Sequence, residues 1–169
     1  MNRPKPEPMQ VVKERRDAAL SALVDGVPFM GFLGVTVDRR GDERTTTLNF
    51  EDKLIGNPML PAIHGGVTAA FLEVTAQVEV SWAMIWDDLE SGRLDAASLG
   101  NGGLPRLPKT IDFTVDYLRS GLPRDAYARA RVTRAGRRYA TVLVEAWQDN
   151  REKLLAQATV HFLMPQRDG

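Results

Sequence analysis

The sequence predicts an α+β domain in which one curved antiparallel sheet wraps around a long central helix. Two features predict this arrangement. Between residues 67 and 85, apolar residues recur every three or four positions, and the segment is apolar over much of its circumference, as a buried helix would be. The last third of the chain alternates apolar and polar residues in four stretches separated by turns, which is typical of half-buried strands.

The N-terminal third is predicted to form a lead-in, a helix and a hairpin. Residues 1–10, with three prolines and mixed charge, are expected to be disordered and to precede a single domain over residues 11–169. A helix is expected at about residues 9–24, overlapping the end of this lead-in, and an apolar connector at residues 28–33 is expected to plug one end of the core. The two strands of a hairpin are expected at residues 34–38 and 44–50.

After the central helix, residues 87–109 are rich in Gly, Asp, Ser and Pro, which predicts a mobile surface loop. The four strands that follow are expected to be joined by hairpin turns into a meander, at residues 111–117, 126–134, 137–149 and 152–164. Small inward-facing residues in these strands indicate that the helix lies close against the sheet; they are Ala128, Ala130, Ala140, Ala146, Ala156 and Ala158.

The composition of the 169-residue chain excludes several classes of function. Lys plus Arg equals Asp plus Glu at 22 each, which argues against a nucleic-acid partner. The chain has no cysteine and only two histidines, so a disulfide, a thiolate site and a cysteine nucleophile are excluded, and no metal or cofactor is expected. Neither a membrane-spanning run nor a signal-peptide core is visible, so the protein is expected to be soluble and cytoplasmic, without a membrane partner.

One stretch combines a rigid loop, a glycine pair and a carboxylate. Pro58 and Pro61 restrict the backbone, so the central helix is expected to begin no earlier than about residue 62. Gly65 and Gly66 then fall in its first turn, where unpaired N–H groups can bind an oxygen with partial negative charge. Seven residues after the second glycine, Glu73 lies in an otherwise apolar run.

These residues resemble the hallmark of hotdog-fold acyl-CoA thioesterases of the phenylacetate-pathway type. The shared pattern is Asn57, then His64-Gly65-Gly66, then an acid nine positions after the His, here Glu73. Tyr117-Leu118-Arg119 and Gly136-Arg137-Arg138 also look like the family's pattern. The resemblance covers residues 28–164 and implies a hotdog fold, hydrolysis of an acyl-CoA thioester without a cofactor, and a homo-oligomer, either a dimer or a tetramer.

The chemistry of the reaction suggests a role for each residue. Amides of Gly65 and Gly66 are expected to bind the oxyanion, and Glu73 to act as general base or nucleophile. Since seven residues of helix span about 10 Å, one carbonyl is not expected to touch both groups of one helix. We therefore expect a composite site between two subunits. His64 is expected to orient the glycines or transfer a proton, and Asn57 is a further catalytic candidate.

The remaining candidates contact the substrate. Gln77 occupies the position at which family members with a catalytic Glu carry a water-holding Thr, and it is expected to contact substrate or water. Arg119, Arg137 and Arg138 are candidates for binding the CoA phosphates.

Structural interpretations are open at several of these positions. Glu73 could form a buried ion pair, the glycine pair could serve close packing, and Asn57 could be only a turn residue. Gln77 could bond to a neighbouring strand, and Arg137 and Arg138 could lie on a solvated strand edge.

Two alternative functions are also open. One is a non-catalytic acyl-CoA-binding protein with the same pocket. The other is a hotdog dehydratase of 3-hydroxyacyl thioesters, because residues 56–61 resemble its Gly-Asn-Pro-x-x-Pro loop. The dehydratases carry a His three residues before that Gly, where this chain has Lys53, and their acid follows the second Pro more closely than Glu73 does.

Overall fold

The structure is a computed structural model that describes residues 6–166, so the first half of the predicted lead-in lies outside the described residues. The first helix begins at Met9, and residues 9 and 10 are therefore helical. The helices are α1 (Met9–Asp25), α2 (Pro28–Leu33), the short 3₁₀ helix η1 (Asp52–Leu54), α3 (Gly65–Glu90) and α4 (Ala96–Gly100). The strands are β1 (Val35–Arg40), β2 (Glu43–Leu48), β3 (Ile55–Asn57), β4 (Ala62–Ile63), β5 (Lys109–Tyr117), β6 (Ala126–Ala135), β7 (Tyr139–Trp147) and β8 (Ala156–Leu163).

Six strands form one antiparallel sheet in the order β1-β2-β6-β7-β8-β5, and β3 pairs with β4 separately. The predicted meander was wrong at its first connection, because β5 pairs with β8 and not with β6. The segment after β5 therefore does not form a hairpin; it carries the chain across to β6, which pairs with β2. On its way the carbonyl of Gly121 accepts a hydrogen bond from the N–H of Ile63 in β4 at 2.8 Å. This topology leaves β5 at one edge of the sheet and β1 at the other.

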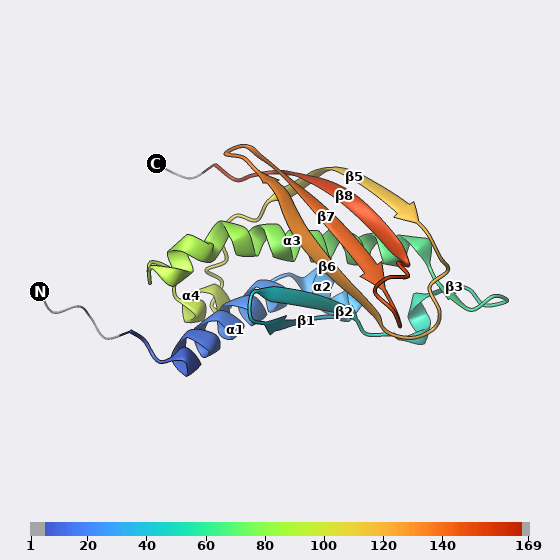
Figure 1. Cartoon of the computed structure of the whole chain (residues 1–169), viewed down its shortest axis with the longest axis horizontal. Helices are drawn as coiled ribbons and strands as arrows, with labels where there is room; N and C mark the ends of the chain where they lie inside the picture. The colour runs from blue at the N-terminus through green and yellow to red at the C-terminus, as the bar shows by residue number, and fades with distance from the viewer. Residues whose placement is uncertain (1–5, 167–169) are drawn as a thin grey trace, which may run out of the picture.

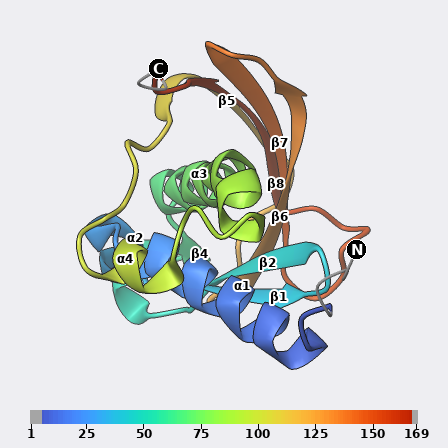
Figure 2. The same cartoon turned by 90° about the vertical axis from the view of Figure 1, so that its left-hand side faces the viewer.

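Helix α3 lies along the concave face of the sheet (Figure 1). Seen along the helix, the sheet covers one side of α3, and α1, α2 and α4 lie on another (Figure 2). The side of α3 next to β5 is crossed only by the segment that leads into that strand (Figure 2). The arrangement confirms the predicted fold class, and one face of the central helix is covered by no other helix or strand of the described chain.

Two predicted segments differ in detail. Helix α3 continues to Glu90 and is followed by α4, so part of the expected loop over residues 87–109 is helical. Leu89 and Leu99, both fully buried, explain this difference, since each secures a short polar stretch to the core. The predicted apolar connector over residues 28–33 is the helix α2.

The core lies between α3 and the sheet. Five of the six inward-facing alanines are buried, and Ala130 is partly buried, so the helix approaches the strands closely as predicted. The buried side of α3 carries Phe71, Trp82 and Ile85. The Trp82 ring packs on the Trp86 ring with centroids 5.8 Å apart. Trp82 is buried in the core and Trp86 is partly buried against it, and both lie on the side of α3 that faces away from Glu73.

Candidate active site

The segment before α3 is fixed by a close backbone approach. Gly56 in β3 lies directly against His64, and a Cβ atom at this glycine would be 2.8 Å from the His64 Cα. The N–H of His64 donates to the carbonyl of Leu54 at 2.9 Å. Only a residue without a side chain fits at position 56 without movement, so this glycine sets the position of the helix N-terminus.

His64 caps α3 with its own ring. Its Nδ1 accepts a hydrogen bond from the N–H of Gly66 at 2.9 Å. A ring nitrogen that accepts carries no proton, so this geometry assigns the proton of a neutral ring to Nε2. The amide of Gly66, expected to bind the oxyanion, is therefore already engaged. The N–H of Gly65 has no acceptor among residues 6–166 and is the free donor of this first turn.

Tyr117 at the end of β5 was not assigned a role from the sequence. Its hydroxyl donates to the carbonyl of Gly65 at 2.8 Å and thereby ties the first turn of α3 to the edge strand. Its ring also lies 3.6 Å from the position that a Cβ of Gly65 would take. The strand alternation placed Tyr117 on the apolar face of its strand, but only the structure brings it to the glycine pair.

Glu73 is partly buried and unpaired. Its carboxylate forms no hydrogen bond or ion pair with any residue in the described part of the chain. At 100° per residue, Gly66, Gln77, Val80 and Met84 lie within about 40° of it around the helix axis. These residues form a stripe on α3, which we call the Glu73 stripe. Gln77, also partly buried, likewise has no side-chain hydrogen bond within residues 6–166.

The carboxylate and the free amide belong to distant parts of the helix. Glu73 lies eight residues beyond Gly65, about 12 Å along the axis. An oxyanion donor must come within about 3 Å of the reacting oxygen, and a base must reach the attacking water at a similar distance. A single chain therefore does not bring the two groups to one carbonyl.

Asn57 holds a turn at the end of β3. Its Oδ1 accepts hydrogen bonds from the N–H groups of Met59 at 3.0 Å and Leu60 at 3.4 Å. The side chain thus shapes the loop between β3 and β4, as a turn residue does. No hydrogen bond connects it to His64 or to the glycine pair within the described residues.

A cavity of about 1170 Å³ opens between the C-terminal half of α3 and the far ends of the strands. Its apolar wall includes Val80 and Met84 of the Glu73 stripe. Three exposed arginines also line it: Arg106, which the sequence did not single out, and the predicted Arg137 and Arg138. None of the three forms an ion pair with a carboxylate of residues 6–166.

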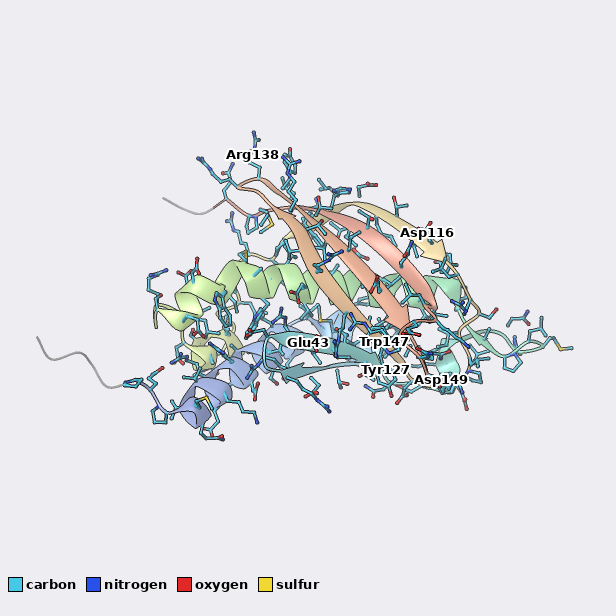
Figure 3. All side chains as sticks on the ribbon, in the orientation of Figure 1. Glu43, Asp116, Tyr127, Arg138, Trp147 and Asp149 are labelled. Carbon is cyan, nitrogen blue, oxygen red and sulfur yellow. The ribbon has the colours of Figure 1, made fainter. Side chains whose placement is uncertain are left out.

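Arg119 lies apart from these three arginines. Its guanidinium donates to the carbonyl of Leu154 at 2.7 Å, just beyond the end of β5. In Figure 3, Arg138 lies at one end of the sheet, whereas Asp116, close to Arg119 in sequence, lies at the other. One chain therefore cannot direct Arg119 and Arg138 to the same phosphate.

Other charged side chains of α3 have structural partners. Glu79 accepts two hydrogen bonds from Arg44 at 2.7 and 2.6 Å, and Glu90 accepts two from Arg16 at 2.9 Å each. The Arg16 hydrogen bonds lower the pKa of Glu90. These pairs fasten α3 to β2 and α1, in contrast to the unpaired Glu73.

Residues 6–166 contain neither a cluster of potential metal ligands nor a membrane-spanning helix. This part of the chain contains no group of three or more His, Cys, Asp or Glu side chains placed to hold a metal ion. None of its helices combines the length and apolar character needed to cross a bilayer.

The sequence of this chain is similar to those of known acyl-CoA thioesterases. The family model for the acyl-CoA thioesterase N-terminal domain matches residues 56–163, which span β3 to the end of β8. The medium/long-chain acyl-CoA thioesterase YigI of Escherichia coli K12 is 30% identical over 141 residues, covering 82% of this chain and 86% of YigI.

Solved structures give the same architecture. A Shewanella oneidensis protein related to the thioesterase superfamily superposes with a TM-score of 0.66 at 26% identity, covering 94% of this chain and 100% of that protein. A Bacillus halodurans protein crystallised with CoA superposes with a TM-score of 0.61 at 20% identity, covering 91% and 96% of the two chains. The likeness to the second protein concerns the fold alone.

Proposed function

Since this chain belongs to the hotdog-fold acyl-CoA thioesterase family and is a thioester hydrolase, we propose that it cleaves medium- to long-chain acyl-CoA at a site shared by two subunits. The observation that carries the proposal is the unpaired Glu73, which lies on the same helical stripe as a large cavity but about 12 Å from the helix N-terminus. The chain-length class is taken from the similarity to YigI.

The second subunit is proposed to join at β5. This edge strand has a free row of backbone groups and carries Ile111 and Thr114, residue types that favour strands. Antiparallel pairing of β5 with its copy places a two-fold axis perpendicular to the sheet. That axis keeps both α3 helices on the same face of the joined sheet and makes them antiparallel. Glu73 of one helix can then face the N-terminus of the other.

The proposed reaction uses one group from each helix. The free N–H of Gly65 and the positive end of the α3 dipole stabilise the negative charge that develops on the thioester oxygen. Glu73 of the other subunit either removes a proton from the attacking water or attacks the carbonyl carbon itself. The C–S bond breaks and CoA leaves as a thiolate that takes up a proton. Water supplies the hydroxyl of the fatty acid, directly when Glu73 is the base, or by hydrolysing the anhydride between the acyl group and Glu73 when Glu73 is the nucleophile.

The cavity is proposed to hold the CoA part of the substrate. Met84 lies eleven residues beyond Glu73, about 16 Å along the axis, so the apolar wall can accompany the extended pantetheine arm away from the carboxylate. Arg106, Arg137 and Arg138 lack carboxylate partners within the described residues and can bind the phosphates. Antiparallel β5 pairing also brings Arg119 of one subunit toward the arginine cluster of the other.

A thiol-release assay with Glu73→Gln tests the proposal. Wild type is expected to hydrolyse acyl-CoA esters with medium to long chains, and the variant to lose about a hundredfold or more in kcat while remaining a dimer. Glu79→Gln is the matched control on the same helix, because Glu79 is paired with Arg44. Retained activity in an intact Glu73→Gln dimer contradicts the role of Glu73, and the absence of turnover on any acyl-CoA contradicts hydrolysis of these esters.

A further inference from the structure

The loop between β3 and β4 ends in an exposed apolar tip. Met59 is 88% exposed and Leu60 is 72% exposed, although both are large apolar side chains. We call residues 57–61 the apolar tip. Figure 1 shows it beyond β3, projecting past the N-terminal end of α3.

The backbone of the apolar tip is restricted. Pro58 and Pro61 restrict its backbone, and Asn57 accepts hydrogen bonds from the N–H groups of Met59 and Leu60. A segment held in one conformation before binding loses little entropy when it docks. The tip therefore presents two apolar side chains in a shape suited to a preformed surface.

The shared site determines what lies opposite the tip. If Glu73 of one helix faces Gly66 of its antiparallel copy, the C-terminal direction of one helix is the N-terminal direction of the other. Val80 lies about 10 Å beyond Glu73 toward the C-terminus of α3, and the apolar tip projects past the N-terminal end of α3 (Figure 1). The tip of one subunit is thereby directed to the part of α3 where Val80 and Met84 line the cavity.

We propose that the apolar tip of each subunit docks over the cavity of the other and forms the outer wall of the channel for the pantetheine arm. The inference rests on the proposed shared site and assigns it a further component. Met59 and Leu60 complete the apolar lining beside Met84, while the arginine end of the cavity stays open for phosphates. Asn57 then acts as a positioning residue for this wall.

A second copy of the chain fits the tip better than a membrane surface does. Residues 56–63 contain no Lys or Arg, so the tip offers no charge for anionic headgroups. The cavity, in contrast, presents an apolar surface in the direction that the two-fold arrangement requires.

The absence of cysteine makes cross-linking a direct test. In the variant Met59→Cys/Met84→Cys, a short bis-maleimide is expected to link two subunits into a covalent dimer. Each single variant, and the matched control Met59→Cys/Ser98→Cys, should give little product, because α4 lies on another side of α3 (Figure 2). Equal cross-linking of the test and control pairs would overturn the proposal.

Kinetics provide the second test. Met59→Ser/Leu60→Ser is expected to raise KM for acyl-CoA about tenfold and to change kcat less than about threefold. The reason is that the tip contacts would bind the substrate and the transition state equally, and loss of such contacts raises KM but not kcat. The control Phe29→Ser/Phe32→Ser removes another exposed apolar pair, 47% and 70% exposed, and should leave KM unchanged. An unchanged KM in the tip variant contradicts the proposal.

Two further outcomes separate the possible explanations. A dimer whose activity depends on Glu73 but whose tip variants behave like wild type leaves the proposed function intact and refutes only the docked tip. Flotation with phosphatidylcholine–phosphatidylglycerol vesicles that is abolished by Met59→Ser/Leu60→Ser would identify a membrane as the occupant and overturn the assignment to a second copy.

Discussion

Replacing Gly56 with Ala is predicted to damage the active site without touching any group that reacts. The new methyl carbon would lie 2.8 Å from both the Cα and the Cβ of His64. To reach the 3.4 Å at which ordinary contact begins, the backbone must move by roughly 0.6 Å. Gly56 has no positive φ, so the effect is purely steric.

The displaced atoms belong to the cap of α3. His64 would carry its hydrogen bond to Gly66 with it, and the free amide of Gly65 would turn away from its position. Misplacement of this size is expected to lower kcat by about tenfold or more. Overpacking of this kind costs about 1–3 kcal/mol, which in a chain of this size lowers Tm by roughly 3–10 °C.

Thiol release and thermal unfolding, measured side by side, check this prediction. Gly31→Ala in α2 is the matched control, because a Cβ there meets nothing within 4 Å. Since Ala is favoured over Gly inside a helix, the control should keep its activity and gain up to about 1 kcal/mol. Wild-type kcat and Tm in Gly56→Ala would refute the claim that this glycine positions the helix N-terminus.

Three further predictions concern other contacts. Tyr117→Phe removes the hydrogen bond to the Gly65 carbonyl and should lower kcat about threefold to tenfold with a loss of about 1 kcal/mol, measured by thiol release and urea unfolding. Hydrogen bonds from Arg16 lower the pKa of Glu90, so the ionised Glu90 stabilises the folded protein above the unfolded-state pKa of about 4.3. This stabilisation is lost as pH falls through the lower folded-state pKa. Between about pH 5 and pH 3, the Tm of Glu90→Gln should therefore fall less than the Tm of wild type. Arg138→Ser should raise KM for acyl-CoA and reduce its salt dependence, but leave hydrolysis of acyl-pantetheine, which lacks the nucleotide phosphates, unchanged.

Periodicity predicted most of the elements because each strand and the central helix expose one face and bury the other. It missed α4 because Asp95 reads as a loop residue, although its carboxylate caps that helix by accepting from the N–H of Ala97 at 3.2 Å. Periodicity could not predict the order of the strands in the sheet. A turn signal such as Ser120-Gly121-Leu122-Pro123 shows that the chain changes direction but not whether the next strand is a neighbour.

Within the candidate site, residue types were predictable and partners were not. The sequence gives no sign that the ring of His64 would occupy the amide of Gly66, since this depends on one side-chain rotamer. Nor does it show that Asn57 would bond to its own turn. Arg119 and Arg138 have the same chemistry, and only the pairing of strands shows that they lie at opposite ends of the sheet.

The distance between Glu73 and its own helix N-terminus has a physical reason. A carboxylate in the first turn would accept the free N–H groups itself, as a capping residue does, and would neutralise the positive end of the helix dipole. Eight residues beyond Gly65, Glu73 cannot reach the Gly65 amide of its own helix, so the donor stays available for a substrate oxygen. In the proposed dimer, two-fold symmetry offers each helix N-terminus the carboxylate of the other subunit, with the substrate carbonyl between them. The separation that makes the proposed site depend on two chains therefore also prevents Glu73 from accepting a hydrogen bond from the donor of its own helix.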